Sequence, residues 1–416
     1  MTADSMRVVY LNPCGQMGGA EISLIDLLSS MRLAEPGWDL GLVLGEDGPL
    51  VQRARGLGVG VTVAPFPKAL ARLGDSGSGP AGALWSCLKA AAGTLGYVSR
   101  LRRTLSEMQP DVVHTNGFKM HVLGVWARPA AVPVIWHIRD YVSTRPLMKR
   151  LLRMHAGRCA AAIGNSVSVA RDVQGVCGAH LETICIYNAI DLKRYSPSGE
   201  KIDLDSLAGL EPTPEGTVRI GLAATLAHWK GHAVFLRALA QLPKDLPYRA
   251  YIIGGAIYQT ENSQRTLDEF RQLAFTLEIA DRVGFTGYVA DTASAIRSLD
   301  ILVHASTQPE PFGRVIAEGM ACGRAVICSN AGGAAELFSD GQDALAHPPG
   351  DVAALASRIA ELARDPEQRA RLGRAGRATA EGRFDSSRLS GELIPLYRRL
   401  SGQVAPQPEE QLAVTR

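Results

Sequence analysis

The stretch DILVHASTQPEPFGRVIAEGMACGRAVICSN (300–330) alternates strand-like and helix-like sequence. The runs DILVHAS (300–306) and RAVICSN (324–330) are almost continuously apolar. Between them, a loop at 308–311 leads into a helix that we expect to open near Gly313. Near-continuous apolar runs predict strands buried on both faces, and strands separated by a helix predict a parallel sheet. The stretch therefore predicts one unit of a doubly wound α/β domain.

Similar apolar runs recur along the chain in two series separated by a gap. The first series comprises 7–11, 40–45, 59–65, 111–116, 132–138 and 160–166. The second comprises 218–224, 248–255, 281–287, 300–306 and 324–330. The gap between the two series, 196–217, is rich in Pro, Gly, Ser and acidic residues. This composition is typical of an interdomain connection and predicts a hinge. We therefore predict two α/β domains.

The remaining sequence completes this division. A glycine- and serine-rich piece, 74–82, predicts a mobile loop, and 352–384 predicts an amphipathic helical stretch with a break at Asp365-Pro366. The predicted parts are an N-terminal domain (1–196), a linker (197–217), a C-terminal domain (218–385), a helix crossing back to the N-terminal domain (386–403) and a flexible tail (404–416).

Charge and cysteine usage narrow the class of protein. The 416 residues carry 44 Lys plus Arg and 41 Asp plus Glu, a net charge of +3, which argues against a nucleic-acid partner. The seven cysteines are odd in number and include no Cys-x-x-Cys pair, which argues against a disulfide framework and a metal cluster. The first residues predict a strand and not a signal peptide. The apolar stretch 82–99 contains Lys89 and several glycines, so it falls short of the continuous apolar sequence that a membrane-spanning helix needs. We expect a cytoplasmic protein, at most peripheral at the inner membrane face.

The helix expected near Gly313 has the features of a phosphate site. Backbone N–H groups of Gly313, Arg314 and Val315 would point out of the helix start, where the helix dipole favours an anion. Glu310 precedes this site and Glu318 lies inside the helix, and a carboxylate can accept hydrogen bonds from vicinal hydroxyls. One carboxylate for a sugar and one for a ribose, flanking a diphosphate, describe a nucleotide-sugar site. The alternative is an ordinary helix with an Arg314–Glu318 pair at i, i+4.

This segment resembles the retaining glycosyltransferases of family 4. Their Glu-x7-Glu motif is present as Glu310-Pro-Phe-Gly-Arg-Val-Ile-Ala-Glu318, followed by Gly332-Gly333-x-x-Glu336. Other family-like blocks occur in the family's order, at 18–21, 111–116, 136–140, 164–166, 187–191, 226–232, 252–255 and 283–289. The resemblance covers about residues 6–385 and implies the GT-B fold, in which two Rossmann-like doubly wound domains face a central cleft.

The resemblance also implies catalytic and donor-binding roles. Glu310 and His137 would contact the transferred sugar, Lys230 the diphosphate and Glu318 the ribose. The other donor-binding candidates are Gly18, Gly19, Thr225, Phe285, Tyr288, Val289, Phe312, Gly313, Arg314 and Val315. Each role has a structural alternative. Gly18 and Gly19 could form an ordinary strand-to-helix turn, Lys230 could be a solvated lysine, and His137 could be a core histidine. The side chains around 285–289 could simply pack in the wall of the domain.

The acceptor-side candidates are less specific. Asn116, Arg139 and Asn165 lie at or just after the ends of predicted strands and would face the cleft, although such asparagines also cap turns. At Thr225 the chain departs from the family, whose members often have an arginine there, and Arg314 is the nearest replacement for that cation. The basic stretch 144–158 would contact a membrane or an acidic lipid phosphate, or would be a half-solvated surface helix.

The implied reaction is retaining transfer of a sugar, most simply from a UDP-sugar, to a hydroxyl of a small metabolite, lipid carrier or glycan. The resemblance implies no metal and no cofactor, and the single Asp-x-Asp, Asp203-Leu-Asp205, lies in the linker. A dehydrogenase would need Gly-x-Gly-x-x-Gly, which Gly15-Gln-Met-Gly18-Gly19 does not match. A nucleotide-sugar epimerase or hydrolase, a phosphorylase, and a non-catalytic sugar-nucleotide-binding protein are the alternatives. The sequence does not identify the sugar, the base, the acceptor or the oligomeric state.

Overall fold

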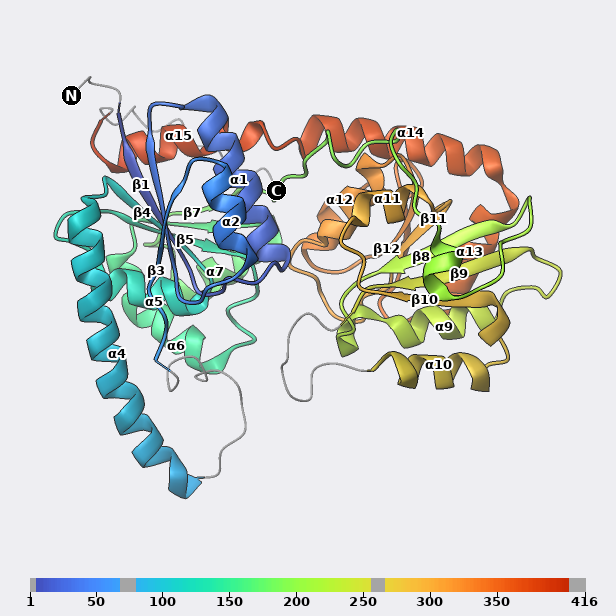
Figure 1. Ribbon diagram of the computed structural model, residues 1–416, viewed down its shortest axis with the longest axis horizontal. Coiled ribbons are helices and arrows are strands. Elements are labelled where there is room, and N and C mark those ends of the chain that lie inside the picture. The colour runs from blue at the N-terminus through green and yellow to red at the C-terminus, as the bar shows by residue number, and fades with distance from the viewer. Residues whose placement is uncertain (1–4, 68–79, 256–265, 404–416) are drawn as a thin grey trace.

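A computed structural model describes residues 5–67, 80–255 and 266–403 (Figure 1). Residues 74–79 of the predicted mobile loop and the predicted tail 404–416 lie outside these ranges. Within them, the chain forms two parallel sheets, each at the centre of its own α/β domain. The two domains lie side by side in Figure 1, and the helices near the C-terminus extend across both.

The first domain contains a seven-stranded parallel sheet in the order β3-β2-β1-β4-β5-β6-β7. Its strands are β1 (Arg7–Asn12), β2 (Asp39–Leu44), β3 (Gly60–Val63), β4 (Val112–Asn116), β5 (Val134–Ile138), β6 (Ala161–Gly164) and β7 (Thr183–Cys185). Its helices are α1 (Gly19–Ala34), α2 (Pro49–Gly56), α4 (Pro80–Met108), α5 (Phe118–Ala127), α6 (Pro146–His155) and α7 (Val167–Cys177).

The second domain contains a six-stranded parallel sheet in the order β10-β9-β8-β11-β12-β13. Its strands are β8 (Val218–Ala223), β9 (Tyr248–Ile253), β10 (Val283–Gly287), β11 (Ile301–His304), β12 (Ala325–Ser329) and β13 (Leu345–His347). Its helices are α8 (Leu204–Ala208), α9 (His232–Ala240), α10 (Leu267–Thr276), α11 (Thr292–Arg297), α12 (Arg314–Ala321), α13 (Val352–Arg364) and α14 (Pro366–Arg383). The predicted break at Asp365-Pro366 is confirmed, because Asp365 accepts a hydrogen bond from the backbone N–H of Gln368 and begins α14.

The apolar runs form strands because both faces of each sheet are covered. In β1, Val9 and Leu11 enter one core, while Val8 and Tyr10 enter the opposite core. The same alternation occurs in β9, where Ile252 and Tyr251 belong to different cores. The two predicted doubly wound domains are thereby confirmed.

Two segments connect the domains. The backbone N–H of Ile190 donates to the carbonyl of Phe384 at 2.7 Å, so the outgoing and returning segments run side by side. Helix α15 (Arg388–Leu400) then packs on the first domain, where Leu393 and Tyr397 are fully buried. In Figure 1, α14 lies along the second domain and α15 along the first. The predicted return of the C-terminal helix is what the structure shows.

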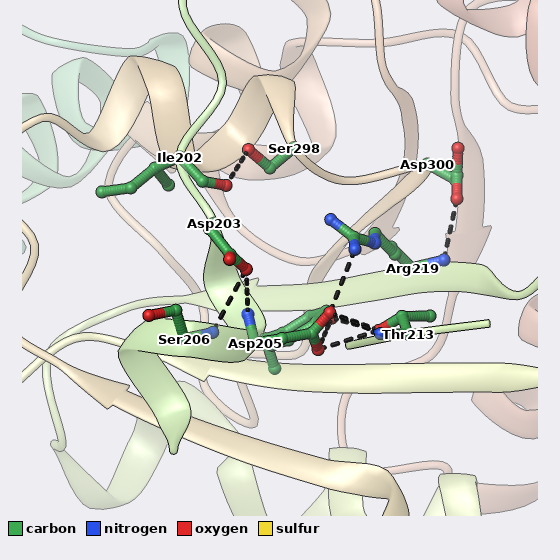
Figure 2. A network of polar contacts seen from close by, with 9 residues as sticks. Ile202, Asp203, Asp205, Ser206, Thr213, Arg219, Ser298 and Asp300 are labelled. Atoms are coloured by element: carbon green, nitrogen blue, oxygen red, sulfur yellow. Dashed lines mark hydrogen bonds and ion pairs between the residues drawn. The ribbon is translucent and has the colours of Figure 1, made fainter. Parts of the chain in front are cut away.

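The connection at 197–217, which was predicted to be a hinge, makes many contacts of its own. Figure 2 shows that it is tied to the second domain through polar contacts. Asp203 caps the short helix α8, and the Ile202 carbonyl accepts from Ser298 at 2.7 Å. Most of the connection is therefore part of the second domain's surface, and the side-by-side segments near Ile190 and Phe384 are the narrow crossing between domains.

Asp205 is the centre of the contacts in Figure 2. Its carboxylate accepts from the Thr213 backbone N–H at 2.9 Å, from the Tyr251 hydroxyl at 2.7 Å and from Arg219 at 3.1 Å. Burial opposes ionisation of Asp205, but the hydrogen bonds from Thr213 and Tyr251 outweigh it and lower its pKa. The Asp-x-Asp pair thus has protein partners of its own.

We predict that Asp205→Ala lowers the unfolding free energy by about 1–3 kcal/mol, because buried donors lose their acceptor. Asp203→Ala is the control, since a helix cap two residues away is typically worth about 1 kcal/mol. Urea unfolding of both variants measures the difference. Equal losses in the two variants would show that the Asp205 contacts add nothing beyond the cap.

Candidate active site

The candidate residues of the second domain lie on loops after the carboxyl ends of β8 and β11. Lys230 ends a short 3-10 helix (His228–Lys230), and Glu310 lies between β11 and α12. The next residue, Gly231, has φ +76°, and a Cβ added there would lie 1.8 Å from the Ala305 carbonyl oxygen. The loop that presents Lys230 therefore packs directly on the chain that leads to Glu310, and only glycine fits at the point of contact.

Glu310 is a buried carboxylate with a cationic partner. Its Oε1 lies 2.5 Å from Lys230 Nζ and accepts from Ser306 Oγ at 2.5 Å. Burial raises the pKa of Glu310, but the Lys230 ammonium outweighs it and holds the pKa far below its usual range. Its backbone is fixed as well, since Gly333 N–H donates to the Glu310 carbonyl at 2.7 Å. The carboxylate is ionised and rigidly placed.

Helix α12 begins where predicted, with Gly313 as its N-cap at φ +84°. The first N–H groups of such a helix have no acceptor inside it, so Arg314 and Val315 supply donors at this end. The Phe312 ring, in contrast, is buried in the core near Tyr187 and Phe384. The main chain of Phe312 is thus the part left for a ligand.

Arg314 contacts both domains. Its guanidinium lies 2.8 Å from Glu318 Oε1 and 2.8 Å from Asp26 Oδ2 of α1, and it donates to the Ala189 carbonyl at 3.0 Å. The helix-pair alternative is therefore what the structure shows. The Nη2 of Arg314 makes no hydrogen bond to any described residue, and the role of Arg314 as the replacement for the family arginine at Thr225 stays a prediction.

The donor-binding candidates at 285–289 differ in the exposure of their side chains. Val289 lies in one core of the second domain, whereas Phe285 is partly buried against the other core, with Arg271 over its ring. Wall packing describes both side chains. Tyr288 is 67% exposed and lies beside Gly255, so it is the member of this group with a free face.

The acceptor candidates of the first domain form one buried network. Arg139 donates to Asn116 Oδ1 at 2.8 Å, to Asn188 Oδ1 and to His137 Nδ1 at 3.3 Å. Asn165 Nδ2 is 3.5 Å from the Arg139 carbonyl, while its buried Oδ1 has no hydrogen-bond partner among the described residues. The structure thus brings His137, Asn116, Arg139 and Asn165 together at the ends of β4, β5 and β6.

This network extends to residues that sequence reasoning missed. Asn116 donates to Asn12 at 2.6 Å, and Asn12 donates to Glu21 at 3.3 Å. The other oxygen of Glu21 accepts from the Gly18 backbone N–H at 3.2 Å, which fixes the start of α1. A Cβ added at Gly19 would meet no protein atom within 4 Å, so the space beside this turn is open. A family-like block at 18–21 and asparagines at strand ends were the available signals.

The domains meet at the site through two further contacts. Tyr141 donates to the Glu310 carbonyl at 3.2 Å and accepts from Gly333 N–H at 3.2 Å. Glu336 accepts from the backbone N–H groups of Val167 and Ser168 at 2.9 and 2.7 Å, and so caps α7 from the other domain. The glycine-rich segment after Glu310 thus holds the two halves together.

The basic stretch 144–158 contains α6, whose Leu152 is buried while Lys149, Arg150 and Arg153 are exposed. This is the half-solvated surface helix of the sequence analysis, and membrane contact stays a prediction. Among the described residues, no helix has the length and apolar character needed to cross a membrane. The same part of the chain contains no cluster of three or more potential metal-ligating side chains. The expected absence of metal and cofactor stays a prediction.

Comparison with known proteins identifies two glycosyltransferase domains in the chain. A model described as glycosyl transferases group 1 matches residues 211–379, and one described as glycosyltransferase family 4 matches residues 17–194. The chain is 28% identical over 313 residues to lipopolysaccharide core biosynthesis glycosyltransferase LpsD of Rhizobium meliloti, a match covering 72% of this chain and 78% of that protein. It is 28% identical over 232 residues to spore coat protein SA of Bacillus subtilis, covering 53% of this chain but only 60% of that relative's length.

A solved structure extends the match to the whole fold. The crystal structure of Anabaena Alr3699/HepE in complex with UDP-glucose has a TM-score of 0.75 and 26% sequence identity, and the match covers 95% of this chain and all of that one. Two family models that occupy successive domains, a GT-B relative of similar fold and the Glu-x7-Glu segment agree. The chain belongs to the family 4 glycosyltransferases, which have the GT-B fold.

Proposed function

We propose that the protein transfers a sugar, with retention of anomeric configuration, from a UDP-sugar to a hydroxyl of a small metabolite, lipid carrier or glycan. The observation that carries this proposal is the ion pair between buried Glu310 and partly exposed Lys230, at 2.5 Å, where the two domains meet. An ion pair of this kind holds a cation ready for an anionic leaving group. The structure of HepE with UDP-glucose supports the choice of UDP.

Lys230, Glu310 and the start of α12 each have a role in the proposed reaction. The bond between the anomeric carbon and the diphosphate oxygen breaks, and an oxocarbenium-like transition state forms beside the departing diphosphate. Lys230 moves from Glu310 to the diphosphate and offsets the charge that develops there. Glu310 then contacts the transferred sugar, and the first N–H groups of α12 bind phosphate oxygens.

The acceptor hydroxyl attacks from the same face that the leaving group vacates. Its oxygen forms the new bond to the anomeric carbon, and its proton passes to the departing phosphate. No part of this step requires a metal or a cofactor. A cytoplasmic location belongs to the same proposal and is supported by the six described cysteines, all of which are free thiols.

A thermal-shift panel of UDP-, GDP- and ADP-sugars tests the donor class, because a ligand that binds the folded state raises its apparent stability. We expect the largest shift with a UDP-sugar, and release of UDP on addition of acceptor. Binding without any release of UDP would favour the non-catalytic sugar-nucleotide-binding alternative.

Glu318 is expected to bind the ribose. Losing a charge-assisted hydrogen bond costs about 1.5–3 kcal/mol, so Glu318→Ala should weaken UDP binding about 10- to 150-fold in isothermal titration. Asp26→Ala is the matched control, since it removes the other carboxylate that holds Arg314 at 2.8 Å. Equal losses in the two variants would mean that Glu318 acts through Arg314 and not on the ribose.

A further inference from the structure

Four buried side chains from distant parts of the sequence form a hydrogen-bonded row that ends at His137. The hydroxyl oxygen of Tyr10 in β1 lies 3.4 Å from the hydroxyl oxygen of Tyr397 in α15. The same Tyr397 oxygen lies 2.7 Å from His114 Nδ1. His114 Nε2 lies 3.1 Å from His137 Nδ1. All four residues are at most 2% exposed. The C-terminal helix therefore reaches the candidate site through a continuous polar path.

The direction of these hydrogen bonds follows from Arg139. A guanidinium donates and cannot accept, so His137 Nδ1, at 3.3 Å from Arg139 Nη2, must be the acceptor. A neutral imidazole whose Nδ1 accepts has its proton on Nε2. Burial, with the nearby charge of Arg139, lowers the pKa of His137 and of His114 well below the usual value, so both rings are neutral.

The donor and acceptor of each remaining hydrogen bond in the row follow from this one. Because His137 Nδ1 is an acceptor, His114 Nε2 must donate to it at 3.1 Å, and His114 Nδ1 has no proton. His114 Nδ1 therefore accepts from the Tyr397 hydroxyl, and the Tyr397 oxygen accepts from Tyr10. In this arrangement Arg139 and the Nε2–H of His114 share the single lone pair of His137 Nδ1, and the Nε2–H of His137 is left as the inner end of the row.

This inner end lacks a partner. His137 Nε2 is buried and makes no hydrogen bond to any residue that the structure describes. Buried donors are almost always satisfied in folded proteins, so the unpaired N–H marks a place for an acceptor from outside the chain. A hydroxyl oxygen of the transferred sugar is such an acceptor.

We infer that Tyr397 and His114 are positioning residues that, together with Arg139, hold His137 in the tautomer with Nε2–H, as a hydrogen-bond donor to the transferred sugar. The inference deepens the proposed function and rests on it for the identity of the acceptor. It also gives the return of α15 a chemical role in addition to its packing, since Tyr397 lies on that helix. His137 orients the sugar in this scheme and transfers no proton.

The test is a long-range ¹H–¹⁵N spectrum of the full-length protein with ¹⁵N-labelled histidine, with His137 assigned from His137→Gln. In the wild type we expect His137 as a single tautomer, protonated at Nε2 and unprotonated at Nδ1. Tyr397→Phe removes the hydroxyl that holds His114 Nδ1 and should produce a mixture of tautomers at His114, which weakens the hydrogen bond to His137 Nδ1 and shifts its resonance, while Arg139 still donates to that nitrogen. A wild-type His137 protonated at Nδ1, or an unchanged spectrum in Tyr397→Phe, would overturn the inference.

Kinetics supply the second readout. Tyr397→Phe should lower kcat by about 2- to 12-fold, the effect of one neutral hydrogen bond, while the Kd for UDP stays unchanged. The matched control is Tyr248→Phe, which removes another buried hydroxyl, bonded to the Leu239 carbonyl at 3.2 Å in the second domain, and should leave kcat and the histidine spectrum unaltered. An unchanged kcat in Tyr397→Phe would contradict the positioning role.

Different results would refute the hydrogen-bonded row and the proposed function. The tautomer of His137 is observed without any substrate, so an Nδ1–H form refutes the row of hydrogen bonds whether or not the protein transfers sugar. A wild-type protein that has the expected tautomer but neither binds nor cleaves any nucleotide sugar refutes the proposed function instead.

Discussion

Replacing Glu310 by Gln is expected to lower turnover of the UDP-sugar about 10²- to 10³-fold, the loss seen when one preorganised polar contact to a transition state is removed. The substitution keeps the shape of the side chain and an oxygen that can accept from Ser306, at 2.5 Å in the wild type. The loss therefore reports the charge of the carboxylate. Steady-state assays of UDP release measure it.

The same variant should bind UDP as well as the wild type or better. Lys230 is 2.5 Å from Glu310, and without that partner the ammonium is available to the diphosphate. Isothermal titration with UDP alone separates this effect from turnover. If turnover of Glu310→Gln stays within a few-fold of wild type, Glu310 has no role on the transferred sugar.

Lys230→Ala is the second large effect we expect. Loss of the charge-assisted contact to the diphosphate should cost about 1.5–3 kcal/mol, which raises the Kd for UDP about 10- to 150-fold. Lys244→Ala is a matched control, because it removes the same charge from an exposed position of the same domain. A Kd for UDP that is unchanged in Lys230→Ala would place the diphosphate elsewhere.

The pH dependence of stability checks the Glu310–Lys230 pair without any ligand. Because the pKa of Glu310 is lowered in the folded protein, the pair stabilises the fold above the ordinary pKa of about 4.3, and this contribution is lost as pH falls. In Lys230→Ala the largest of the interactions that lower the pKa of Glu310 is removed, so less of this stabilisation is present to be lost. The difference in Tm between wild type and variant should therefore be larger at neutral pH than under acid conditions.

The strands were predictable where their apolar runs were long. The short strands β7 (Thr183–Cys185) and β13 (Leu345–His347) were missed, because three residues are too few to show a hydrophobic pattern. The contacts of the linker were not predictable because its polar residues look solvated in sequence, whereas Asp205 is bound by Thr213, Tyr251 and Arg219. Composition reports polarity but not the partners that satisfy it.

The candidate site shows the same division. The Arg314–Glu318 pair was one of two predicted alternatives because an i, i+4 spacing brings side chains together on a helix. Its third member, Asp26, comes from the other domain, and the contact between Tyr397 and His114 joins residues 283 positions apart. Such contacts depend on how the domains and α15 pack, and spacing along the chain carries no signal of them.

The central claim is that a UDP-sugar is cleaved with retention at the site containing Glu310. Time-resolved ¹H NMR of the reaction with the donor identified in the thermal-shift panel tests it most directly, because the anomeric proton of the first product reports its configuration. The account predicts that a UDP-α-sugar gives the α-product first, and that Glu310→Gln slows its appearance about 10²- to 10³-fold. A β-product formed first, or α-product formed at the wild-type rate by Glu310→Gln, would contradict it.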